Sequence, residues 1–110
     1  MTYQEIAQMV DEFNLPYEYH HFDEKSGQQP PFVVFYYPGI DDLYADNINY
    51  QRITQLTIEL YTDEKDFENE SVIEEKLTEY GLSYEKTEVY IDTEKMYEVI
   101  YTMEVVINGK

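Results

Sequence analysis

The chain has 110 residues, 24 of them acidic and 7 basic, so its formal net charge is −17. A field of that sign repels phosphate backbones and anionic lipid, which argues against sequence-specific DNA binding and against a membrane partner. No cysteine is present, which excludes disulfides and thiolate metal sites. The length and the 43% hydrophobic content predict one globular domain, residues 1–110, with a modest core.

The first 13 residues predict an amphipathic helix. Thr2 followed by Glu5 has the spacing of a capping box, in which each residue satisfies the backbone N–H of the other. Asn14 and Pro16 are typical of a helix end. The apolar side chains recur at helical spacing and predict the buried stripe Ile6, Met9, Val10 and Phe13.

Three strands are expected after this helix. Residues 16–22 alternate loosely and residues 32–37 form a compact apolar run, so we predict that the two pair as a long-looped hairpin. The connector 39–50 is either a flexible loop or a bent strand start. Residues 51–62 alternate strictly and predict a strand whose core face carries Leu56, Ile58 and Leu60.

A second helix and a hairpin complete the chain. Asp63 or Asp66 is expected to cap the helix and Gly81 to end it. Its predicted buried stripe is Ile73, Leu77 and Tyr80, flanked by Phe67 and Val72. The remaining residues alternate around a turn at 92–95 and predict two antiparallel strands.

The element order is therefore α-β-β-β-α-β-β. Short links between neighbouring strands favour an α+β fold with a mostly antiparallel sheet and two helices packed on one face. The other face should be polar, acidic and rich in tyrosine.

The one metal-like cluster is His20 and His21 with Asp23 and Glu24. Adjacent residues of a strand point to opposite faces, which disfavours a shared ion. The acidic residues between 41 and 47 lack the spacing and the central glycine of an EF-hand loop. We predict no metal site and no cofactor.

No catalytic motif is present. The three serines are outside any G-x-S-x-G pattern, the phosphate loop G-x-x-x-x-G-K-[ST] is absent, and no cysteine nucleophile exists. The many carboxylates single out no acid–base pair in a pocket. We therefore predict no catalytic residue and a protein that is not an enzyme.

Three stretches carry a family resemblance: "NLPYEYHHFDEKSGQQPPFVVFYYP", "YADNINYQRITQLTIELYTDEKDFENE" and "VYIDTEKMYEVIYTMEVVI". Together they resemble a family of small phage and prophage proteins from Gram-positive bacteria. These are described as tail-completion, tail-terminator or head–tail joining proteins. The similarity covers nearly the whole chain, and "YAD", "IELYTD-x-KD" and "E-x-x-Y" are its most specific elements.

The resemblance implies a virion structural protein without catalytic residues. Such proteins form a ring, commonly a hexamer, at the head-proximal end of a tail tube. The implied partners are further copies of the chain, the tail-tube protein and the head-connector proteins. The implied location is the virion, with the host cytoplasm during assembly.

An assembling ring needs contact surfaces, and the loop 40–49 is our candidate for one. We predict that it is an interface arm whose contact residues are Ile40, Asp41, Asp42, Leu43, Tyr44, Asp46 and Asn47. Like-charged subunits repel, so assembly should strengthen with salt.

Two other interpretations remain open at this point. The charge of −17 also suits an acidic DNA mimic that blocks a host DNA-binding enzyme. A soluble adaptor is the third possibility.

Overall fold

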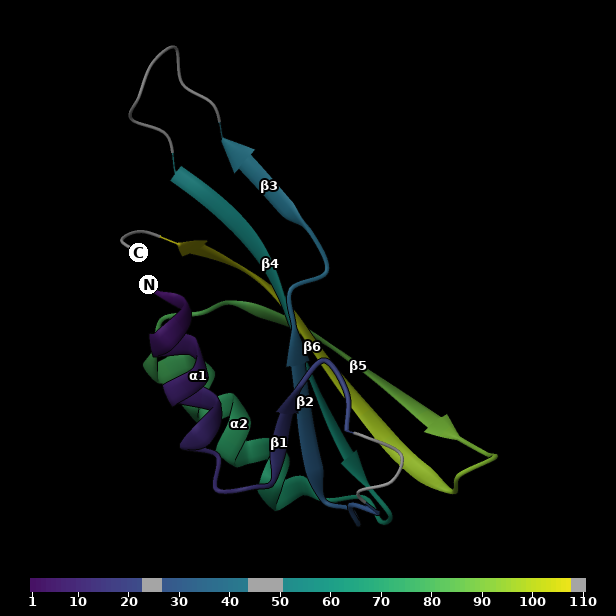
Figure 1. Cartoon of the computed structure of the whole chain (residues 1–110). Helices are drawn as coiled ribbons and strands as arrows, with labels where there is room; N and C mark the ends of the chain where they lie inside the picture. The colour runs from purple at the N-terminus through teal and green to yellow at the C-terminus, as the bar shows by residue number, and fades with distance from the viewer. Residues whose placement is uncertain (23–26, 44–50, 108–110) are drawn as a thin grey trace.

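A computed structural model describes residues 1–22, 27–43 and 51–107, and the side chains of 40–43 and 51–52 are outside that description. The elements in chain order are α1 (Tyr3–Asp11), β1 (Tyr17–Tyr19), β2 (Phe32–Tyr36), β3 (Ile40–Leu43), β4 (Gln51–Thr62), α2 (Phe67–Glu79), β5 (Tyr84–Ile91) and β6 (Met96–Ile107). Both helices lie on one side of the sheet (Figure 1). The predicted α+β class and element order are confirmed, with the short strand β3 added in the connector.

The sheet has the order β1-β2-β4-β6-β5, and β3 also pairs with β4. Every pairing is antiparallel except one. β1 runs parallel to β2, with Tyr17 opposite Val33, so the predicted hairpin between these two strands is wrong. Residues 20–31 provide the dozen positions that a parallel connection needs, whereas a tight hairpin would need only two.

The helix-covered face holds the core. Leu56, Ile58 and Leu60 of β4 are fully buried, as the alternation predicts. The helices add Ile6, Met9, Val10, Ile73 and Leu77, and the strands on either side of β4 add Val33, Phe35, Val99, Tyr101, Met103, Val105 and Ile107. One continuous apolar layer therefore joins both helices to the centre of the sheet.

Local signals in the sequence define the helix ends. The Thr2 N–H donates to Glu5 Oε1 at 2.8 Å, and the Glu5 N–H donates to Thr2 Oγ1 at 3.1 Å. Asp66, rather than Asp63, caps α2 by accepting the Asn69 N–H. Gly81 follows the last turn at a φ of 75°, a conformation that glycine adopts without strain.

The predicted buried stripe of α2 is confirmed, whereas its predicted flank at Phe67 is not buried. Ile73 and Leu77 are buried and Tyr80 is partly buried against the core, but the Phe67 side chain is 71% exposed. Glu70, which was not predicted to be buried, is 3% exposed. Within the described residues, no helix is long and apolar enough to cross a membrane.

Candidate functional site

The predicted contact residues begin with a strand rather than a loop. Ile40, Asp41, Asp42 and Leu43 form β3, which pairs with the segment of β4 from Thr54 back to Gln51. β4 is long enough to extend past the end of β2, so its backbone offers hydrogen-bond partners to β3. Tyr44, Asp46 and Asn47 lie outside the described residues. The contact role of this segment stays a prediction.

A bulge separates β2 from β3. Tyr36 lies opposite Thr57 and Ile40 lies opposite Thr54, so three residues on one strand face two on the other. Within the bulge, the Gln55 N–H donates to the Gly39 carbonyl at 2.9 Å. A bulge bends its strand and increases the local twist. β3 and the start of β4 accordingly extend away from the helices (Figure 1).

The open face, which is the side of the sheet without helices, contains a buried carboxylate. Glu59 is only 9% exposed. It accepts a hydrogen bond from Tyr36 Oη at 2.7 Å. Tyr61 Oη lies 2.8 Å from Glu59 Oε1 and 2.9 Å from Glu98 Oε2. Two phenols and two carboxyl groups therefore form one network, the Tyr–Glu network of the open face.

Burial and charge change the acidity of these groups. Burial, together with the hydrogen bond to Glu59, raises the pKa of Tyr36 to about 12, and the same causes raise the pKa of Tyr61. Burial and the charge of Glu59 raise the pKa of Glu98. A phenol has one proton and can donate to one carboxylate at a time. The hydrogen bond from Tyr61 acts in the opposite sense and lowers the pKa of Glu98, because it favours the charged carboxylate.

Aromatic rings cover this network. Phe32 stacks on Tyr61 with ring centroids 5.0 Å apart, and Phe22 packs edge-on against Phe32. The His20 ring lies 5.4 Å from the Tyr36 ring. The open face is thus acidic and rich in tyrosine, as predicted. Its central carboxylate is nevertheless shielded from water by neighbouring side chains.

Contrary to the prediction, His20 and His21 are not adjacent residues of a strand. They follow the end of β1, and His20 has a φ of 74°, so the two Nδ1 atoms approach to 3.2 Å. The prediction that the two side chains point to opposite faces is therefore wrong. Asp23 and Glu24 lie outside the described residues. The residues that are described contain no group of three or more metal-ligating side chains.

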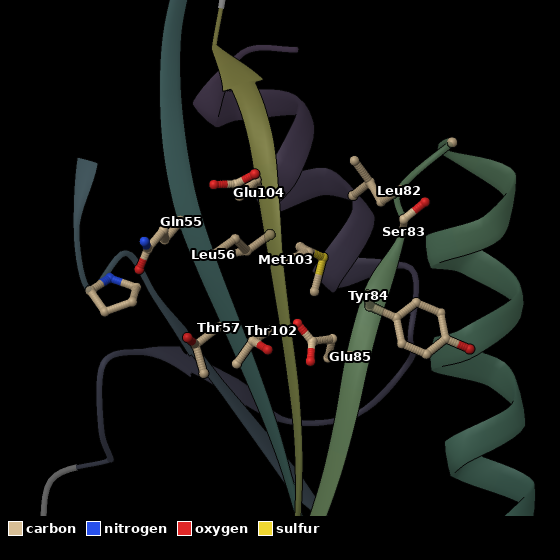
Figure 2. Close-up of a pocket in the computed structure, with 12 residues that line it drawn as sticks. Gln55, Leu56, Thr57, Leu82, Ser83, Tyr84, Glu85, Thr102, Met103 and Glu104 are labelled. Atoms are coloured by element: carbon tan, nitrogen blue, oxygen red, sulfur yellow. The ribbon is translucent and has the colours of Figure 1, made fainter. Parts of the chain in front are cut away.

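A shallow cavity of about 850 Å³ opens beside the start of β5 and the neighbouring parts of β6 and β4. Figure 2 shows strand side chains around it, among them Gln55, Thr57, Thr102 and Glu104. It is lined by Pro38, Gln55, Leu56, Thr57, Gly81, Leu82, Ser83, Tyr84, Glu85, Thr102, Met103 and Glu104. Ser83 is the only serine in this lining, and the lining contains no histidine and no cysteine. The cavity therefore presents hydroxyl and carboxylate groups, and no serine–histidine or cysteine–histidine pair lines it.

An ion-pair cluster joins α2 to β5. Glu70 accepts Lys65 Nζ at 2.5 Å on one oxygen and Lys86 Nζ at 2.8 Å on the other. Lys86 also lies 2.7 Å from Glu74, and Lys65 pairs with Glu88. These contacts raise the pKa of Lys86, with the bond to Glu70 the largest cause and that to Glu74 the next.

The burial of Glu70 was readable from its position in the helix. It stands three residues before Ile73 and seven before Leu77, so helical spacing places it on the buried stripe. A carboxylate in that place requires a cation, and Lys65 and Lys86 supply two.

Comparison with known proteins gives a fold relationship. No family model and no curated protein matches the chain. Among solved structures, a chain of the "virion of native gene transfer agent (GTA) particle" aligns with a TM-score of 0.63 and 12% identity. The alignment covers 97% of this chain and 91% of that one. At this identity the likeness concerns the fold.

Proposed function

We propose that the protein is a non-enzymatic structural component of a phage virion. The observation that carries this proposal is the fold likeness to a chain of a gene transfer agent particle, which extends over nearly the full length of both chains. The cavity is compatible with it, because its lining contains no serine–histidine or cysteine–histidine pair.

More specifically, the chain forms a ring, commonly of six copies, at the head-proximal end of a tail. The ring ends growth of the tail tube and joins it to the head-connector proteins. Assembly takes place in the host cytoplasm, and the ring then remains in the virion. The formal charge of −17 suits this place, because an acidic ring wall makes few contacts with passing DNA phosphates.

The alternative role as a DNA mimic is less well supported. A mimic must present its carboxylates to a basic partner. Glu59 and Glu70 are instead buried, the first under tyrosine hydroxyls and the second between two lysines. These two carboxylates are therefore occupied within the chain.

The test is the mass in solution by light scattering after size exclusion, at low and high salt. We expect a species of about six times the 13.2 kDa chain mass, or a mass that increases with salt as repulsion is screened. Electron microscopy would then show the ring. A mass that falls with salt, or a protein captured by a basic DNA-binding enzyme in competition with DNA, would contradict the proposal.

The predicted contact segment can be tested in the same assay. Leu43→Glu adds a charge to it, and Val106→Glu adds the same charge to an exposed residue of β6. We expect the first variant to lose the ring and the second to keep it. Equal assembly of both variants would mean that residues 40–49 are not part of the interface. The proposal of a ring would not be affected by that result.

A further inference from the structure

β5 is an edge strand whose outer side is open. It ends the sheet, so within the described chain only β6 pairs with it. The six side chains from Glu85 to Tyr90 are all exposed, which means that side chains on both faces of the strand reach solvent there. An open strand edge offers unpaired backbone donors and acceptors to another strand. We propose that the β5 edges of two copies pair in an antiparallel, two-fold dimer.

The sequence of β5 is complementary to itself. Its central part reads "YEKTEVY" from Tyr84 to Tyr90. A two-fold axis at Thr87, perpendicular to the sheet, places Thr87 opposite Thr87 of the second copy. The same axis places Lys86 opposite Glu88 of the second copy, and Glu88 opposite Lys86. Opposite charges facing each other across two strands stabilise their pairing.

The two registers that differ from this one by two residues are less favourable. A shift of two residues in one direction puts Lys86 opposite Lys86, and in the other direction Glu88 opposite Glu88. Like charges directly opposite each other destabilise a strand pair. Charged side chains on an edge normally discourage pairing. Here they discourage the shifted registers and favour the one centred on Thr87.

The ion-pair cluster on the helix side extends naturally across this contact. Lys86 already binds Glu70 and Glu74, and Glu88 already binds Lys65. In the dimer, Lys86 would contact Glu88 of the second copy. The charges would then alternate in sign along a series that runs from Glu74 to Lys86 of one chain and from Glu88 to Lys65 of the other. No charge in this series has a neighbour of its own sign.

The aromatic residues at the two ends of β5 add to the match. Tyr84 packs edge-on against Tyr101 at 5.4 Å, and Tyr90 packs edge-on against Tyr97 at 5.0 Å. The register places Tyr84 opposite Tyr90 of the second copy, so the two aromatic pairs become neighbours. Cross-strand aromatic pairs contribute to the stability of a sheet.

The dimer is a different contact from the ring. A closed ring joins two different surfaces of each copy, whereas this dimer uses one surface twice. Failure of one proposal therefore leaves the other standing.

The first test uses cysteine cross-linking, because the chain has no cysteine of its own. Directly opposite residues of antiparallel strands have Cα atoms about 4.5–5.5 Å apart, within the range of a disulfide. Thr87→Cys should therefore give a reducible dimer under mild oxidation. Val89→Cys is the control, because its two copies would be about 13 Å apart in this register. No cross-link in the first variant, or equal cross-linking in both, overturns the proposal.

The second test changes the charge match and measures the dimer dissociation constant by sedimentation. Glu88→Lys puts Lys86 opposite a lysine at two places, and we expect a dissociation constant raised by about tenfold or more. Glu94→Lys makes the same charge change in the turn after β5 and should leave the dimer intact. Circular dichroism checks that both variants fold. A wild-type chain that stays monomeric, or an unchanged constant for Glu88→Lys, refutes the pairing.

Discussion

The two faces of the sheet bury their central residues by different means. On the covered face, Ile58 and Leu60 of β4 are fully buried under the helices. Between them along the same strand, Glu59 is 9% exposed although no helix covers it. Tyrosine hydroxyls and stacked rings shield it instead. Apolar alternation therefore identifies the face that receives helices, but it does not identify every buried position.

The largest expected effect is on the covered face. Leu60→Ala should lower the free energy of unfolding by about 3 kcal/mol, because it removes a fully buried side chain and leaves a cavity. Urea unfolding measures the change. The control is Val106→Ala at a partly exposed position, which should change stability by about 0.5 kcal/mol or less. Similar losses in both variants would mean that the covered face is not the main core.

A smaller loss is expected on the open face. Tyr61→Phe keeps the stacked ring but removes the hydroxyl that lies between Glu59 and Glu98. We expect the free energy of unfolding to fall by about 1.5 kcal/mol. Tyr90→Phe, at an exposed tyrosine, is the matched control and should be nearly neutral. If the two variants were equally stable, the Tyr–Glu network would contribute nothing to the fold.

The smallest expected effect is an increase in the free energy of unfolding rather than a decrease. The pKa of Glu98 is raised in the folded state by burial and by Glu59, so the folded protein holds this proton more tightly than the unfolded chain does. At a pH below the pKa of an ordinary carboxyl group, protonated Glu98 therefore adds to the free energy of unfolding. This contribution is lost as the pH rises through the raised pKa of the folded state. Glu98→Gln removes that loss and should stabilise the protein at neutral pH by about 1 kcal/mol, discounted for partial exposure.

The pH dependence is the decisive part of this last prediction. Thermal unfolding of the variant and the wild type should differ at pH 7 and converge in acid. A difference that is constant with pH would mean that the charge of Glu98 plays no part.

Much of the fold was predictable because its signals are local. The capping box of Thr2 and Glu5, the glycine after α2 and the alternation of residues 51–62 each act within a few residues. The direction of β1 was not predictable, because the polar connection after it is long enough for either orientation. β3 was left open, as a loop or a bent strand start, because its sequence, "IDDL", has two aspartates, which are disfavoured in strands. It forms because β4 extends past β2.

Only the residue composition of the candidate surfaces was predictable from the sequence. Composition indicated an acidic, tyrosine-rich face. The contact between Tyr61 and Glu98 depends on the register of β4 against β6, which places these residues directly opposite each other. The register of two strands is set when the whole sheet assembles, so it cannot be read from any short stretch of the chain.

The phenol–carboxylate bonds also make the protein report optically on its own structure. The chain has 13 tyrosines and no tryptophan, so its near-ultraviolet absorbance comes mainly from phenol groups. Tyr36, Tyr61 and Tyr101 have raised pKa values, all with burial as the largest cause. Exposed phenols ionise near pH 10, and these three would ionise later. A spectrophotometric titration in alkali would therefore show these three phenols as late-ionising groups without any label.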